Sequence, residues 1–168
     1  MATLTDHEVA PFPANAAEPH LSAARAALLA DVSVEVLPRD ADRLAAAADP
    51  VPPGTTVYVP FLPTGTLAGS LAAARRLRAA GFDPVVHLPA RRVRGRAELA
   101  DFLDGAADAG IDAILLLAGD AETPVGPFAD TLDVLSTGLV EAAGLSRVGF
   151  AGHPEGHPKA DVATLDRA

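Results

Sequence analysis

Short apolar runs alternate with longer amphipathic stretches from about residue 31 to the end of the chain. The apolar runs predict strands at residues 32–37, 55–61, 84–88, 111–118 and 147–151. The amphipathic stretches predict helices at 21–30, 40–48, 67–80, 96–109 and 128–143, and several of them end at a glycine. A further helix is expected to begin at residue 161. The pattern is therefore a repeated strand–helix unit.

Strands that alternate with helices predict a parallel sheet with right-handed crossovers, in the α/β class. Two architectures fit: part of a (β/α) barrel, or an open doubly wound parallel sheet. A complete eight-stranded barrel needs about 250 residues, and this chain has 168. We therefore expect a partial (β/α)8 TIM barrel of about five parallel βα units, truncated relative to a complete one. Residues 1–20 are proline-containing and predict a disordered N-terminal arm, whereas residues 21–168 predict a single α/β domain.

Composition narrows the classes of partner. The formal net charge is -9, which argues against nucleic acid as the main partner because phosphate binding needs an excess of Lys and Arg. The absence of cysteine excludes disulfides, thiolate nucleophiles and cysteine metal sites. No run approaches the roughly 18–20 apolar residues of a membrane span, and the N-terminus does not resemble a signal peptide. We expect a cytoplasmic protein without a membrane partner.

Titratable residues gather at the predicted C-terminal ends of the strands, where parallel α/β folds place their chemistry. Glu35 lies in an otherwise apolar strand, and alternation points it the same way as Ser33 and opposite to Val34 and Val36. A carboxyl group that faces a barrel interior can serve as a general acid. The alternative is that Glu35 lies on the solvated face of an edge strand.

Two further strand ends carry candidate groups. Asp120 follows Gly119, where a glycine permits close approach of a ligand, although an ordinary capping turn is the competing interpretation. His153 and His157 have the spacing of a helical metal pair, but Pro154 and Pro158 disfavour a helix. We expect a rigid loop that presents imidazoles to a ligand, and no metal.

The chain's basic run follows the third predicted strand and consists of Arg91, Arg92, Arg94 and Arg96. It is either a clamp for a phosphate or polyanionic ligand, or a solvated loop and helix start. No glycine-rich dinucleotide motif follows the first strand, and residues 63–70 lack the lysine of a P-loop. Rossmann-type and P-loop nucleotide sites are therefore disfavoured.

Four of these motifs together resemble methylenetetrahydrofolate reductases. Residues 149–158, Gly-Phe-Ala-Gly-His-Pro-Glu-Gly-His-Pro, resemble the fifth-strand signature of that family. The first-strand motif of the family is matched by residues 33–38, Ser-Val-Glu-Val-Leu-Pro. The end of its third strand is similar to residues 87–88, and its fourth-strand Gly-Asp is similar to residues 119–120. The resemblance implies a (β/α)8 barrel that carries FAD and passes reducing equivalents from NAD(P)H to methylenetetrahydrofolate, giving 5-methyltetrahydrofolate in one-carbon metabolism.

The resemblance also implies roles for individual residues. Glu35 matches the general acid that opens the folate ring, and Asp120 matches the aspartate near flavin and pterin. Positions matching the FAD site are His87, Ala118, Gly119, Asp120, His153 and His157. Two of these depart from the family pattern, because His153 stands where a tyrosine is usual and Ala118 replaces an arginine or glycine. The strand-two end lacks the family's usual run, and strands six to eight are absent.

Two functions follow as expectations. The first is a methylenetetrahydrofolate reductase-like flavoprotein, an oxidoreductase that uses FAD, NAD(P)H and a folate. The alternative is a non-catalytic flavin- or folate-binding subunit, or a fragment, that completes its barrel as a homo-oligomer or heteromer. An unrelated α/β hydrolase is disfavoured, because no serine lies in a nucleophile-elbow context.

Overall fold

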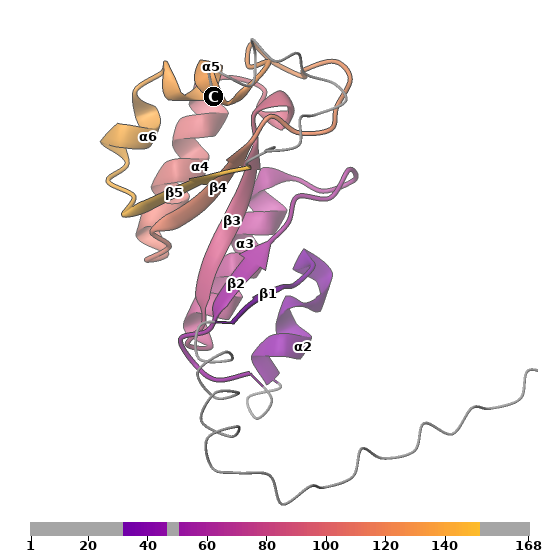
Figure 1. Cartoon of the computed structure of the whole chain (residues 1–168), viewed down its shortest axis with the longest axis vertical. Coiled ribbons are helices and arrows are strands. Elements are labelled where there is room, and N and C mark those ends of the chain that lie inside the picture. Colours follow the sequence, from indigo (N-terminus) through magenta and orange to yellow (C-terminus); the bar gives the residue numbers. More distant parts are fainter. Residues whose placement is uncertain (1–31, 47–50, 152–168) are drawn as a thin grey trace, which may run out of the picture. The chain divides into compact units, whose positions relative to one another are not determined.

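A five-stranded, all-parallel sheet forms the centre of the protein in the computed structural model, which describes residues 32–46 and 51–151 (Figure 1). The strands are β1 (Ser33–Glu35), β2 (Thr56–Val59), β3 (Asp83–Pro89), β4 (Ala113–Leu117) and β5 (Arg147–Phe150). They pair in sequence order, β1-β2-β3-β4-β5. The predicted α/β class and the five predicted strands are confirmed. The described elements belong to one compact unit that begins at Ser33.

Helices connect the strands. Their bounds are η1 (Pro38–Asp40), α2 (Ala41–Ala46), α3 (Leu67–Ala79), η2 (Ala90–Arg92), α4 (Arg96–Asp108), α5 (Thr131–Leu135) and α6 (Leu139–Ala142). The hydroxyl of Thr66 accepts a hydrogen bond from the Gly69 amide at 3.0 Å and thereby caps α3. The predicted arm, the predicted helix at 21–30 and the helix expected from residue 161 lie outside the described residues.

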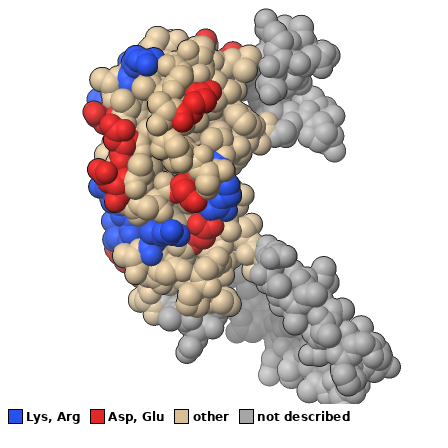
Figure 2. Space-filling model, turned by 90° about the vertical axis from the view of Figure 1, so that its left-hand side faces the viewer, with Lys and Arg blue, Asp and Glu red and all other residues tan. Residues whose placement is uncertain are grey.

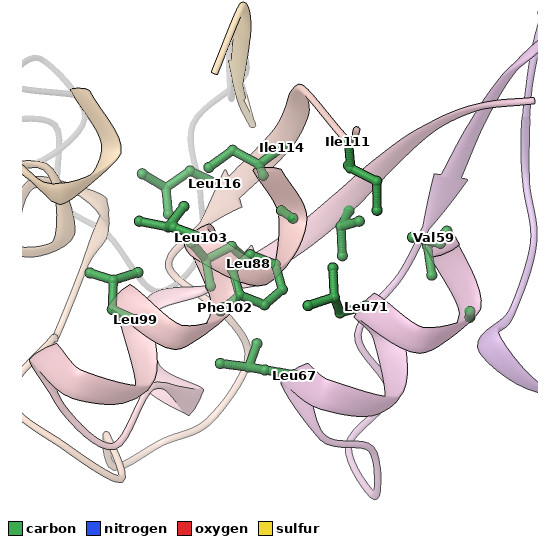
Figure 3. Close-up of a cluster of buried hydrophobic side chains, with 14 of the residues drawn as sticks. Val59, Leu67, Leu71, Leu88, Leu99, Phe102, Leu103, Ile111, Ile114 and Leu116 are labelled. Carbon is green, nitrogen blue, oxygen red and sulfur yellow. The ribbon is translucent and has the colours of Figure 1, made fainter. Parts of the chain in front are cut away.

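The core lies between one face of the sheet and the helices. Val59, Leu88 and Leu116 from successive strands are fully buried against Leu71 of α3 and Phe102 of α4, as Figure 3 shows. These strand residues share one face because side chains alternate along a strand. The helices present their apolar stripes to that face, while Arg75, Arg76 and Arg78 of α3 are exposed.

All the long helices cover the same face of the sheet. Helix α2 packs against α3, α3 against α4, and α4 against α6, which makes one continuous layer. Right-handed crossovers between strands in sequence order place every helix on that side. No described helix covers the opposite side, which we call the helix-free face. The side chains at alternate strand positions therefore project from a face that no described helix packs against, where Leu115 and Leu117 are half-buried and Val85 and Ala113 are buried.

The single helix expected over residues 128–143 is wrong. The structure has two short helices, α5 and α6, separated at Ser136–Gly138. Gly138 adopts φ 68°, the left-handed conformation that glycine accommodates most readily. The hydroxyl of Thr137 donates to the Val134 carbonyl at 2.7 Å and accepts from the Leu139 amide at 3.2 Å, which ends one helix and starts the next.

An ion network closes the N-terminal end of the helix-free face. The guanidinium of Arg147 on β5 lies 2.6 Å from a carboxylate oxygen of Asp83 on β3 and 3.4 Å from Asp112. It reaches across β4 because the register partner of Arg147 is the small Ala113. A hydrogen bond from the Ser146 hydroxyl, followed by the Arg147 charge, lowers the pKa of Asp112. This end of the sheet is held by ionic contacts between side chains.

Within the described part of the chain, no helix is both long enough and apolar enough to span a bilayer.

Candidate functional site

Three polar side chains from neighbouring strands lie on the helix-free face. Glu35 pairs in register with Tyr58, and the Tyr58 ring meets the His87 ring edge-on, with centroids 6.1 Å apart. Val34 and Val36 pack instead against the helix-side core. The alternation expected for Glu35 is therefore confirmed. Glu35 itself is exposed, and β1 is an edge of the described sheet, as the alternative of a solvated edge strand expects.

His87 is the best-defined polar group of this cluster. Burial lowers its pKa, and the negative charge of Glu35 opposes that shift to a smaller extent. Its Nε2 atom is buried without a hydrogen-bond partner among the described residues. A buried ring nitrogen without a partner carries an unfavourable desolvation energy. His87 thus offers a free hydrogen-bonding atom and is neutral at neutral pH.

The lowered pKa of His87 gives a pH dependence with a definite sign. The folded state binds a proton at His87 less readily than the unfolded state, so stability is lost as pH falls below the ordinary value of 6.5. We expect wild type to lose more unfolding free energy than His87→Gln between about pH 7.5 and about pH 5.5. Urea unfolding at both pH values measures this difference. An equal loss in the two proteins would show that His87 titrates normally.

Gly119 and Asp120 form the turn that follows β4. Gly119 has φ 90°, and a Cβ atom there would lie 3.0 Å from the Cβ of Pro89, so the turn requires glycine. The amide of Arg91 donates to the Ala118 carbonyl at 3.0 Å, which joins this turn to the end of β3. Asp120 is exposed at the C-terminal edge of the sheet. Its Oδ1 atom lies 3.5 Å from Nη2 of Arg92 there.

Most of the basic run holds the fold together. Arg91 donates from Nε to the Ala129 carbonyl at 2.7 Å and from Nη1 to the Ala121 carbonyl at 3.2 Å, which anchors the loop after β4. Arg94 pairs with Glu98 at 2.7 Å. The hydrogen bond from Arg94 is the main cause of the lowered pKa of Glu98. These two arginines are structural.

Arg96 is structural as well, because its Nη1 donates to the Thr137 carbonyl between α5 and α6 at 2.8 Å. Arg92 differs from the other members of the run. Its guanidinium lies over the Phe61 ring, 5.9 Å from the centroid, and Nη2 is 3.5 Å from Asp120 Oδ1. Among the described residues, Arg92 is thus the member of the run whose guanidinium makes no hydrogen bond shorter than 3.5 Å.

Charge elsewhere on the surface is mixed. Figure 2 shows basic and acidic side chains interspersed over the face in view, without a broad patch of one sign. Pairs such as Arg76–Asp42 at 2.6 Å and Arg78–Asp83 at 3.5 Å neutralise several arginines locally. Anion recognition by the described part of this face therefore depends on individual arginines and not on a general basic field.

The sequence-derived site is only partly visible. Glu35 and His87 share the helix-free face, whereas Ala118, Gly119 and Asp120 lie at its C-terminal edge. His153 and His157 lie outside the described residues. Sequence reasoning missed Tyr58, although its alternation with Val57 and Val59 places it on the same face as Glu35. No cluster of three metal-ligating side chains occurs in residues 32–46 and 51–151.

The residues of the helix-free face include groups of the kinds that a planar heterocyclic cofactor contacts. The helix-free face offers apolar side chains, Leu115 and Leu117, beside the polar Glu35 and His87. The buried, unpartnered Nε2 of His87 is an atom that the polar edge of a heterocycle could satisfy. Gly149 lets the Leu115 side chain lie close against β5, because a Cβ atom there would lie 3.1 Å from Leu115 Cδ1.

A comparison of the sequence with models of known protein families finds no match.

Proposed function

We propose that this chain forms the first five βα units of a (β/α)8-type barrel that binds FAD and a folate, as in methylenetetrahydrofolate reductases. Strand order supports the barrel over the doubly wound alternative. A doubly wound sheet reverses its strand order at a switch point and carries helices on both faces, whereas here the order is sequential with one helix layer. In such a barrel, the helix-free face becomes the interior.

One observation carries this proposal. Glu35, Tyr58 and His87, from three consecutive strands, share the helix-free face, and the Gly119–Asp120 turn lies at its C-terminal edge. Among the described residues, the buried Nε2 of His87 has no hydrogen-bond partner, which a purely structural role leaves unexplained. A ligand at this face would give that nitrogen a partner.

The proposed roles follow from the chemistry of each group. Bound FAD would supply the transfer of reducing equivalents from NAD(P)H to the substrate. Glu35 would transfer a proton to a ring nitrogen of the folate as the five-membered ring of the folate opens. His87 is neutral and orients the ligand through Nε2, and Asp120 accepts hydrogen bonds at the rim. Tyr58 supports the His87 ring from the side. A cytoplasmic location, consistent with the lack of cysteine, belongs to the same proposal.

A second candidate is a non-catalytic flavin- or folate-binding subunit that pairs with a further chain, either a copy of itself or a different protein. The observation that favours it is the composition of the helix-free face, where Leu115 and Leu117 are only half-buried. Strands β1 and β5 are also the two edges of the described sheet. Apolar side chains and open edges of this kind favour association.

The test is an absorbance spectrum of the purified chain after incubation with excess FAD and desalting. We expect retained flavin bands at about 370 and about 450 nm, followed by flavin bleaching on anaerobic addition of NAD(P)H. Bleaching would favour the reductase, and retained but unreactive flavin would favour the binding subunit. A colourless protein that also fails to bind folate by calorimetry would contradict both candidates.

A further inference from the structure

Arg92 is the arginine of the basic run whose guanidinium the fold leaves incompletely bonded. Its Nε atom is buried and has no hydrogen-bond partner within residues 32–46 and 51–151. Its contact with Asp120 is 3.5 Å, at the outer limit of a hydrogen bond. An arginine cannot lose its charge at physiological pH, so an unpartnered buried N–H remains costly until an acceptor reaches it. Arg92 therefore lacks an acceptor that something else must supply.

The position of Arg92 is that of a ligand-binding group. It follows β3 on η2, Phe61 follows β2, and Asp120 follows β4. The three residues thus meet at the C-terminal ends of three adjacent parallel strands, the edge at which α/β folds bind their ligands. The side chain of Arg92 is 25% exposed, so the guanidinium is both held in place and reachable from solvent.

The chemistry of the Arg92 guanidinium indicates that its missing acceptor is an oxyanion. The cation–π contact with Phe61, 5.9 Å from the guanidinium carbon to the ring centroid, helps to hold the planar group in position. A planar, pre-oriented fork of donors matches the oxygens of a phosphoryl group and binds two of them at once. Asp120 does not block this, because its side chain is 72% exposed and can turn into solvent.

We propose that Arg92 is the anion-binding residue of the site and holds a phosphoryl group of the bound ligand at the C-terminal edge. Arg91, Arg94 and Arg96 take no part, since they bond to backbone carbonyls or to Glu98. The inference rests on the proposed function for the identity of the flavin ligand, whereas the phosphoryl group is specified by Arg92 itself. In FAD, this group is the pyrophosphate.

The experiment compares Arg92→Met with Arg94→Met in the full chain. Methionine keeps an apolar stem over Phe61 but removes the guanidinium, and the Arg94 variant makes the same charge change in the same loop at a side chain that is 77% exposed. Calorimetry with inorganic pyrophosphate at low salt should show Kd raised about tenfold or more in Arg92→Met. Arg94→Met should change Kd by no more than about twofold.

Comparing FAD with riboflavin separates the contribution of the phosphate groups to binding from that of the flavin ring. Arg92→Met should weaken FAD binding about tenfold or more and leave riboflavin binding within about twofold, because riboflavin has no phosphate. If Arg92→Met fails to fold, Arg92→Lys serves instead. Lysine keeps the positive charge but lacks the two parallel N–H donors of a guanidinium. This variant should therefore weaken FAD binding about threefold or more. Unchanged FAD affinity in the variant that folds would overturn the inference.

The outcomes also separate this inference from the proposed function. Pyrophosphate binding that depends on Arg92, without any binding of FAD, would support the anion site and contradict the flavoprotein. FAD binding of equal strength in wild type and Arg92→Met would overturn the anion site and leave the flavoprotein intact. An equal loss of affinity in Arg92→Met and Arg94→Met would show that only the net charge of the loop matters. That result would overturn the inference as well.

Discussion

Replacing Glu35 by glutamine should lower the rate of folate reduction about 10²- to 10⁴-fold, the range typical for loss of a general acid. Glutamine has nearly the same shape, but its amide does not give up a proton as a carboxylic acid does. Reduction of the bound flavin by NAD(P)H needs no proton from Glu35 and should stay within about threefold of wild type. Stopped-flow measurement of the two half-reactions separates these effects.

A matched control for this change is Asp42→Asn. Asp42 also becomes a neutral amide, but its carboxylate pairs with Arg76 in the helix layer and is 74% exposed. Both half-reactions should therefore be unaffected in this variant. A folate half-reaction that survives in Glu35→Gln, or one that fails equally in Asp42→Asn, would remove Glu35 from the proposed role.

Replacing Leu116 by alanine should lower the free energy of unfolding by about 2–5 kcal/mol, as expected for a cavity in a tightly packed core. Leu116 is fully buried on the helix side of β4 and pairs in register with Leu88, which is also fully buried. The helices cannot close a gap of this size without losing other contacts. Urea unfolding followed by circular dichroism measures the change.

The neighbouring residue provides the control. Leu115 has the same side chain and the same strand, but it is half-buried on the helix-free face beside Gly149. Leu115→Ala should cost no more than about 1.5 kcal/mol in the monomeric chain. If Leu115→Ala cost as much as Leu116→Ala, both faces of β4 would be equally packed. That result would contradict an uncovered ligand-binding face.

Hydrophobic patterning was sufficient to locate all five described strands and the two longest helices. Strand β4 was the clearest, because Ala113–Leu117 is a continuous apolar run, in which Ile114 and Leu116 belong to the core and Leu115 and Leu117 are half-buried. The prediction of one helix over 128–143 failed because apolar residues at helical spacing lie on both sides of Ser136–Gly138. A left-handed glycine and a local hydroxyl cap interrupt it there. Such local competition between side chain and backbone is not visible in periodicity.

The sequence predicts the parts of the candidate site that depend on alternation along a strand. It does not predict the parts that depend on contacts with residues far away in the chain. The face of Glu35 follows from the valines on either side of it, and the same logic places Tyr58. The difference between Arg92 and the other arginines does not follow from their shared run. For Arg91, Arg92 and Arg96 it depends on partners 28 to 41 residues away, such as Asp120 for Arg92 and Thr137 for Arg96, whereas Arg94 pairs with Glu98 in the next helical turn.

The most direct test of the central claim is the magnetic resonance signal of His87 Nε2 in the chain with isotope-labelled histidine, recorded while FAD is added. His87→Gln identifies the signal by its disappearance. If the helix-free face binds the flavin, the unpartnered Nε2 gains a neighbour, and its resonance should shift in step with FAD saturation. A resonance that stays in place at full saturation, or a chain that binds no FAD, would contradict the account.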